Sequence, residues 1–218
     1  MLQLISNAFK FLDKTAIVDK DGAHSYSDLL SKSEQIASFL LNGENDLSQA
    51  RVAFMMTPGF DYVAVQWGIW RAGGIAVPLC ISYPFPSLKY VLDDTGANKV
   101  VASQDYLEVL DPLNTIPEID LVPIKSIERF QIASVLPEVD SSRSAMILYT
   151  SGTTSLPKGV LTTHANIESQ VGTLIEAWGW SPKDYTLGLL PLHHVHGIIN
   201  VLSCALWSGA TIQFLHPF

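Results

Sequence analysis

Hydrophobic positions along the first half of the chain alternate between short continuous runs and a helical spacing. The apolar runs predict strands at 15–18, 51–56, 75–79 and 99–102, the first of them rich in β-branched residues. The helical spacing predicts helices at 27–41, 60–72 and 87–94. Ser27 is the expected N-cap of the first of these helices, because its hydroxyl can accept a hydrogen bond from a free backbone N–H.

The same alternation returns after a segment of different composition. Residues 111–142 hold four prolines and only short apolar pieces, so we expect a long connection between two lobes, 1–110 and 143–218. Beyond it, strands are predicted at 144–149, 160–163, 186–190 and 210–215, and helices at 164–178 and 196–207. Repeated strand–helix alternation predicts an α/β fold with layered, largely parallel sheets.

The last predicted strand, 210–215, lies almost at the end of the sequence. We expect it to leave an open sheet edge, which is a liability that natural proteins usually cover. The 218 residues are therefore expected to be the front part of a larger protein, which a downstream polypeptide would complete.

Composition and charge restrict the possible partners. The chain is 48% hydrophobic and 16% charged, and 218 residues are enough to bury a core, so a globular protein is expected. Its net charge of −8 argues against a general affinity for nucleic acid or anionic membranes. No apolar run is long enough to insert into a membrane, and the two cysteines, Cys80 and Cys204, suit reduced buried thiols. We expect a cytoplasmic protein.

Residues 149–160, YTSGTTSLPKGV, combine hydroxyl side chains, glycines and one lysine between two apolar runs. Free backbone N–H groups, hydroxyls and a cation are what a phosphate-binding loop needs. The loop is not a Walker A motif, because Pro157 offers no N–H where that motif has glycine. Gly159 likewise offers no hydroxyl for a metal ion.

The loop resembles that of the adenylate-forming superfamily, which includes the acyl-CoA synthetases. That pattern reads Ser/Thr, Ser/Ala, Gly, Ser/Thr, Ser/Thr, Gly, any residue, Pro, Lys, Gly, and nine of its ten positions fit 150–159. The exception is Ser155, whose Cβ would hinder a positive φ or a close approach to phosphate. Residues 24–40, 70–103 and 191–197 resemble further family motifs in the same order, so the resemblance covers nearly the whole chain.

The resemblance implies a role for each loop residue. The residues that would hold the β- and γ-phosphates of ATP are Thr150, Ser151, Gly152, Thr153, Thr154 and Lys158. They would orient ATP so that a carboxylate attacks the α-phosphorus, while Lys158 stabilises the departing pyrophosphate. Mg²⁺ and CoA would also take part, with most of the Mg²⁺ ligands outside this chain.

Three histidines follow in the segment PLHHVHG, 191–197. No carboxylate or cysteine stands near them to complete a zinc set, so we expect no metal site. A structural role, with neutral imidazoles bonded to the backbone, stays open. The resemblance instead makes His194 a catalytic group that contacts the reacting carboxylate. His193, His196 and Gly197 would complete that substrate pocket.

The amino-acid sequence of this segment and of the residues after it most resembles that of malonyl-CoA synthetases. A dicarboxylate such as malonate would need a cation for its second carboxylate. The four arginines all precede the segment, so the cation would be His193, His196 or an arginine outside this sequence.

The family's later adenine, ribose and hinge motifs do not occur in these residues. We therefore expect no adenylation by the 218-residue chain alone. A non-catalytic, nucleotide-binding or regulatory remnant of the family is the alternative. Activation of an amino acid is a third reading, but it predicts an acidic residue where this chain has His193 and His194.

Overall fold

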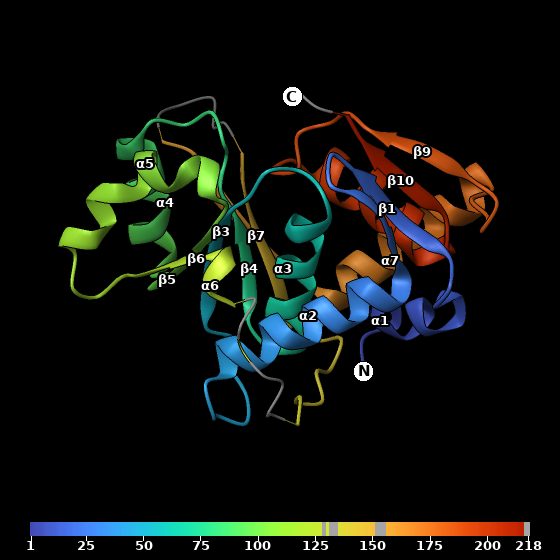
Figure 1. The fold of residues 1–218 in the computed structure, drawn as a ribbon, viewed down its shortest axis with the longest axis horizontal. Coiled ribbons are helices and arrows are strands. Elements are labelled where there is room, and N and C mark those ends of the chain that lie inside the picture. Colours follow the sequence, from blue (N-terminus) through green and yellow to red (C-terminus); the bar gives the residue numbers. More distant parts are fainter. Residues whose placement is uncertain (128–129, 131–134, 151–155, 216–218) are drawn as a thin grey trace.

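A computed structural model describes residues 1–127, 130, 135–150 and 156–215 of the chain. Two sheets organise these residues (Figure 1). The smaller sheet has the order β2-β1-β10-β9, with β1 at Thr15–Asp19, β2 at Gly22–Ser25, β9 at Tyr185–Gly188 and β10 at Thr211–Phe214. The larger has the order β6-β5-β3-β4-β7-β8. Its strands are β3 Arg51–Met55, β4 Ile75–Pro78, β5 Lys99–Ala102, β6 Asp120–Pro123, β7 Ser144–Thr150 and β8 Lys158–Thr163.

Both sheets are mainly parallel, which confirms the predicted α/β class. Neighbouring strands run parallel from β6 to β7 in the larger sheet and from β1 to β9 in the smaller one. Each sheet also has one antiparallel edge strand, β8 beside β7 and β2 beside β1. The two antiparallel pairs are hairpins joined by short loops, whereas the parallel pairs are joined through longer crossovers.

Helices fill the space between the sheets and cover the far side of the larger one (Figure 1). The longer helices are α2 Tyr26–Leu41, α3 Phe60–Arg71, α4 Phe85–Thr95 and α7 His164–Trp178. The shorter ones are α1 Gln3–Ala8, α5 Leu107–Leu110, α6 Ile124–Ile127 and α8 Cys204–Ser208, with 3₁₀ turns at Phe9–Phe11, Gln104–Tyr106 and Asp111–Thr115. A π-helix, η4, spans His196–Ser203 and runs directly into α8, where one continuous α-helix was predicted. One core lies around α2 and α3, and a second lies between the larger sheet and α4.

Three expectations need correction. The strand β10 is not a sheet edge, because it pairs with β1 on one side and β9 on the other. Residues 111–142 are more than a connection, since they supply the edge strand β6. Helix α2 is capped by Ser25 rather than Ser27: the Ser25 hydroxyl accepts from the Asp28 N–H at 3.0 Å, and the Asp28 carboxylate accepts from the Ser25 N–H at 2.8 Å.

Each sheet takes strands from both sides of 111–142. β1 and β2 join β9 and β10, while β7 and β8 join the four strands β3 to β6. In the smaller sheet, β1 pairs in parallel with β10, so that Ile17 lies opposite Ile212 although the two residues come from opposite ends of the sequence. Local hydrophobic patterns carry no information about such distant partners.

Candidate functional site

The strands β7 and β8 form a hairpin whose connecting loop carries the predicted phosphate-binding residues. Thr150 at the end of β7 lies opposite Lys158 at the start of β8. Both are exposed, and the Thr150 hydroxyl lies 3.5 Å from the Lys158 carbonyl oxygen. Four of the predicted residues, Ser151, Gly152, Thr153 and Thr154, lie outside the described residues, as does Ser155. The structure therefore places the two ends of the predicted loop.

Lys158 offers an uncommitted positive charge at this end of the sheet. Its ammonium group makes no hydrogen bond or ion pair to any residue that the structure describes. An exposed lysine without a carboxylate partner keeps its three donors available for an anionic ligand. This geometry suits the predicted role of Lys158 as a phosphate-binding residue.

Helix α4 holds the hairpin in place through two tyrosines. The Tyr90 hydroxyl donates to the carbonyl of Pro157 at 3.0 Å, just before Lys158. From β7, the Tyr149 hydroxyl donates to the Asp94 carboxylate. Burial and the Asp94 charge raise the pKa of Tyr149, so that hydroxyl stays protonated. Both ends of the loop are thus tied to one helix.

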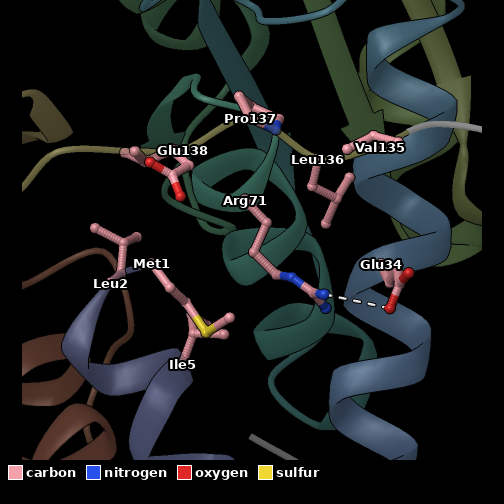
Figure 2. A pocket seen from close by; sticks show the side chains of 10 residues that line it. Met1, Leu2, Ile5, Glu34, Arg71, Val135, Leu136, Pro137 and Glu138 are labelled. Carbon is pink, nitrogen blue, oxygen red and sulfur yellow. Dashed lines mark hydrogen bonds and ion pairs between the residues drawn. The ribbon is translucent and has the colours of Figure 1, made fainter.

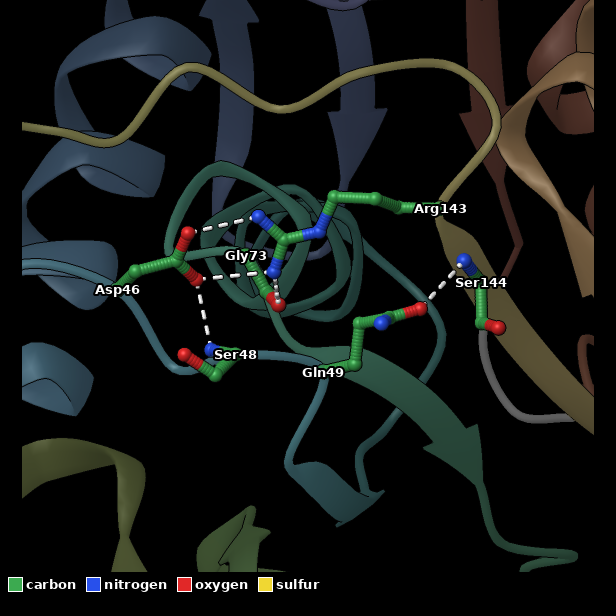
Figure 3. A network of polar contacts seen from close by, with 6 residues as sticks. All are labelled: Asp46, Ser48, Gln49, Gly73, Arg143 and Ser144. Atoms are coloured by element: carbon green, nitrogen blue, oxygen red, sulfur yellow. Dashed lines mark hydrogen bonds and ion pairs between the residues drawn. The ribbon is translucent and has the colours of Figure 1, made fainter.

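The other end of β7 is fixed by a polar network (Figure 3). Arg143 donates to both oxygens of the Asp46 carboxylate at 2.7 and 2.9 Å, and to the Gly73 carbonyl at 2.7 Å. Next to it, the Ser144 N–H donates to the Gln49 side-chain carbonyl at 3.0 Å. A bidentate arginine–carboxylate pair has a fixed geometry, so this network sets where β7 begins.

The histidine segment follows β9, and its first residues line a cavity together with Met56 and Leu79, which follow β3 and β4. His193 is half-buried and His194 is exposed, with their ring centroids 4.1 Å apart. Burial, together with the charge of His194, lowers the pKa of His193 to about 4, so this imidazole is neutral at pH 7. The ring of Tyr83 lies 6.4 Å from that of His193.

A small, mostly apolar cavity of about 290 Å³ opens beside His193. Its walls come from the ends of β3 and β4, the start of α3 and the segment after β9. The lining residues are Met56, Pro58, Tyr62, Leu79, Ile81, Ser82 and residues 189–193. Concave apolar sites with a few polar groups are typical binding pockets for small molecules.

His196 and Gly197 stand at the start of the π-helix η4. The ring of His196 lies 3.3 Å from the Asn200 side-chain amide, one turn further on. A Cβ at Gly197 would lie 2.4 Å from the Pro191 carbonyl oxygen, so only glycine fits between η4 and the histidine segment. π-Helical turns are rare and occur often at functional sites.

One short stretch brings the two parts of the predicted site together. Tyr83 contacts His193, and seven residues later Tyr90 holds Pro157 beside Lys158. Residues 83–90, which lead into α4 and form its first half, therefore lie next to both the histidine segment and the end of the phosphate loop. Sequence reasoning did not single out Tyr83, Tyr90 or Arg143. The only hint in the sequence was that Tyr83 and Tyr90 lie within 70–103, a stretch that resembles a family motif.

Other features of the molecule lie away from this site. A cavity of about 500 Å³ is lined by the chain start, Arg71 and residues 135–139 (Figure 2), but none of the predicted site residues lines it. In the described part of the chain, no three His, Cys, Asp or Glu side chains come together as a metal site. Nor is any helix there long and apolar enough to cross a membrane.

Comparison with known proteins agrees with the resemblance read from the sequence. The family described as AMP-binding enzyme matches residues 5–218. The chain belongs to this family. The match covers both the loop after β7 and the histidine segment.

Individual relatives carry more specific names. The chain is 40% identical over 230 residues to the mitochondrial malonate–CoA ligase ACSF3 of Xenopus laevis, covering 100% of this chain and 40% of that protein. For the human malonate–CoA ligase ACSF3, also mitochondrial by name, the identity is 40% over 225 residues, covering 99% and 39%. Apo MatB from Rhodopseudomonas palustris superposes with a TM-score of 0.86 at 25% identity, covering 100% of this chain and 46% of that chain. This AMP-binding enzyme family member thus spans less than half the length of these relatives.

Proposed function

We propose that the chain forms the phosphate- and acid-binding part of an ATP-dependent acid–CoA ligase, with malonate as the favoured acid. One observation carries the proposal: in a single short stretch, the ring of Tyr83, just before α4, lies 6.4 Å from that of His193, and Tyr90 within α4 bonds to Pro157, next to Lys158. A phosphate-binding cation and an acid-binding pocket on neighbouring segments are what adenylation needs, because the carboxylate must reach the α-phosphorus of a held ATP.

In the proposed reaction, this chain contributes positioning and charge. Thr150, Lys158 and the loop between them hold the β- and γ-phosphates of ATP. The acid's carboxylate oxygen attacks the α-phosphorus, the bond to the β-phosphate oxygen breaks, and pyrophosphate leaves with its charge compensated by Lys158. The thiol of CoA then displaces AMP from the acyl-adenylate, which forms a thioester. His194 would contact the reacting carboxylate, and Mg²⁺ would arrive bound to ATP.

Malonate is favoured by the names of the relatives and by the form of the histidine segment. The geometry restricts how a second carboxylate could be neutralised. His193 is neutral at pH 7, because its pKa is lowered to about 4, so it supplies a hydrogen bond rather than a charge. The candidates that remain for the second carboxylate are His196, which is exposed, and an arginine outside this sequence.

The alternative is a non-catalytic member of the family that binds nucleotide for regulation. Ser155 in the phosphate loop, where glycine is usual, favours it. Under this alternative the chain would bind ATP without discriminating among acids. A cytoplasmic location stays a prediction, since relatives carry the word mitochondrial in their names.

Calorimetric titration and pyrophosphate exchange separate these functions. The purified chain should bind ATP, and malonate should bind more tightly in the presence of ATP than acetate or hexanoate does. Exchange of labelled pyrophosphate into ATP should stay at background with the chain alone. ATP binding with no response to any acid supports the regulatory alternative, and absence of ATP binding overturns both. Exchange that depends on carboxylate would show that the 218 residues suffice for adenylation.

A further inference from the structure

The histidine segment has few attachments to the rest of the molecule. Between Gly188 at the end of β9 and Gly197 in η4, the only buried side chain is that of Leu192. Its neighbours, including His194, are exposed or half-buried. The hydrogen bonds from His194 N–H to Pro191 and from Ile198 N–H to His194 are local. A segment of this kind needs an anchor elsewhere to hold one conformation.

That anchor is the phenol of Tyr62 on α3. Its hydroxyl donates to the Leu192 carbonyl at 2.8 Å, in a buried position. Apart from the local bond from Ile198 of η4, no other hydrogen bond is observed between 189–195 and a different element of the described residues. The Tyr62 ring is itself fixed, since it packs edge-on against Phe54 of β3 with centroids 5.0 Å apart. The bond therefore connects the segment to a rigid part of the core.

Helix α3 also holds the other half of the site. Two turns after Tyr62, the indole N–H of Trp70 donates to the Ala145 carbonyl of β7 at 2.7 Å. Eight helical residues span about 12 Å, so one rigid helix bonds both to the segment that carries His193 and to the strand that leads into the phosphate loop. The distance between the two halves is set by this helix.

We propose that Tyr62 is the positioning residue of the histidine segment: its hydroxyl holds Leu192 so that His193 and His194 keep their places at the acid-binding site. This inference rests on the proposed function for the identity of that site. It assigns Tyr62 no contact with the reacting atoms. Its action passes through Leu192 to the neighbouring histidine.

The pKa of His193 reports whether the segment is held in place, and a general loss of stability would not change it. In the native chain His193 is shielded beside Tyr83 and His194, and its pKa is lowered to about 4. If Tyr62 loses its hydroxyl, Leu192 loses its only distant hydrogen bond and the segment can move toward solvent. His193 would then be better hydrated, and its pKa should rise toward the ordinary value of about 6.5.

The experiment is an NMR pH titration of the histidine rings in the native chain and in Tyr62→Phe, with His193→Gln used to assign the signal. The matched control is Tyr26→Phe, because the buried Tyr26 hydroxyl also donates to a backbone carbonyl, that of Ala210, at 2.6 Å. Tyr62→Phe should raise the pKa of His193 by roughly one unit or more. Tyr26→Phe should lower the midpoint of urea unfolding to a similar degree but leave His193 as in the native chain.

Equal titration of His193 in all three proteins would overturn the proposal. If Tyr62→Phe does not fold under conditions where Tyr26→Phe does, Leu192→Ala is titrated instead: it keeps the backbone carbonyl that accepts from Tyr62, so the pKa of His193 should stay near the native value. A rise in Leu192→Ala would show that the Leu192 side chain holds the segment and would overturn the proposal. ATP and malonate titrations of these proteins keep the two claims separate. A His193 shift without any ligand binding removes the proposed function but leaves the anchor. Binding of ATP and malonate with an unchanged pKa of His193 in Tyr62→Phe removes the anchor but leaves the proposed function.

Discussion

The two ends of strand β7 differ in how their polar groups are used. At its start, Arg143 satisfies both oxygens of Asp46 and the Gly73 carbonyl. At its end, Lys158 lies opposite Thr150 with an ammonium group that no described residue pairs. Saturated polar groups stabilise a fold, whereas unpaired exposed ones are available to a ligand. The comparison predicts that substitutions at the first end change stability and that substitutions at the second change binding.

The largest effect on stability is expected from Gly73→Ala. Gly73 has φ +81°, and a Cβ there would lie 2.2 Å from an Asp46 oxygen and 2.9 Å from Arg143 Nη2. The substitution should cost about 3 kcal/mol in the free energy of unfolding, because backbone strain adds to disruption of the ion pair. Urea denaturation at pH 7 measures it.

Two other glycines serve as controls for that substitution. Gly43 has φ +91° in open space, so Gly43→Ala should cost only about 1 kcal/mol from backbone strain. Gly172 lies within α7 with nothing within 4 Å of a new Cβ, so Gly172→Ala should stabilise by up to about 1 kcal/mol. Equal losses for Gly73→Ala and Gly43→Ala would mean that the Asp46 contact contributes nothing.

A pH-dependent effect is expected at His164, which packs against Trp70 close to Arg143. Burial, together with the Arg143 charge, lowers the pKa of His164 to about 4. The unfolded chain binds this proton near pH 6.5, so the stability contributed by neutral His164 is complete above that pH. It is lost progressively as the pH falls toward 4.

His164→Phe keeps a ring beside Trp70 and removes the titration. The native chain should lose on the order of 2 kcal/mol between pH 7 and pH 5 that the variant does not lose. Thermal unfolding of both proteins across this range measures the difference. If the stabilities of the two proteins changed with pH in the same way, the assignment to His164 would be contradicted. A difference between them at pH 8, where His164 is neutral in both the folded and the unfolded chain, would report only the change in packing.

Asp46→Asn tests the ion pair with little change in shape. Arg143 and Asp46 keep 18% and 30% of their side-chain areas exposed, so screening by solvent limits the expected loss to about 1 kcal/mol at pH 7. Asp120→Asn breaks the more exposed pair with Lys99 and should cost about 0.5 kcal/mol or less. Equal losses in the two variants would remove the special role of the Arg143 pair.

The same pair has a predicted pH signature. Hydrogen bonding from Arg143 lowers the pKa of Asp46, so its contribution is complete above about pH 4, the unfolded value, and is lost as the pH falls through the lower folded value. The difference in stability between the native chain and Asp46→Asn should therefore shrink in acid. A difference that persists below pH 3 would point to packing instead of charge.

The smallest effect on stability is expected at the other end of β7. Lys158 is exposed and unpaired among the described residues, so Lys158→Met should change the free energy of unfolding by less than about 0.5 kcal/mol. Urea denaturation provides the value. A loss of more than 1 kcal/mol would show that Lys158 is part of the stabilising structure.

Local patterns predicted much of the fold. The periodicity of 164–178 and the apolar run 99–102 gave α7 and β5 with the observed bounds. The strand β2, sequence GAHS, was missed because it is short and polar, and β6 was missed because Pro123 ends it within a proline-rich segment. The pairing of β1 with β10 could not be read from the sequence, since it joins residues about 195 positions apart.

The candidate site shows the same division. Lys158 and the histidines were predicted because their residue types and spacing resemble a family motif. The contacts that position them were not predicted: Tyr62 with Leu192, Tyr90 with Pro157 and Arg143 with Asp46. Each of these contacts joins residues that are far apart in sequence, and nothing in the sequence around either residue marks it as part of a contact. In the sequence, Tyr62 and Tyr90 are ordinary residues of predicted helices.

The most direct test of the proposed phosphate-binding role is calorimetric titration of ATP into the native chain, Lys158→Met and Lys183→Met. Lys183 is an exposed lysine in the turn before β9 and serves as the matched control for loss of one positive charge. Lys158→Met should weaken ATP binding roughly tenfold or more, as expected for loss of a charge-assisted contact to phosphate. Lys183→Met should bind as the native chain does. Equal affinities in all three proteins would contradict the assignment of Lys158 to the phosphates of ATP.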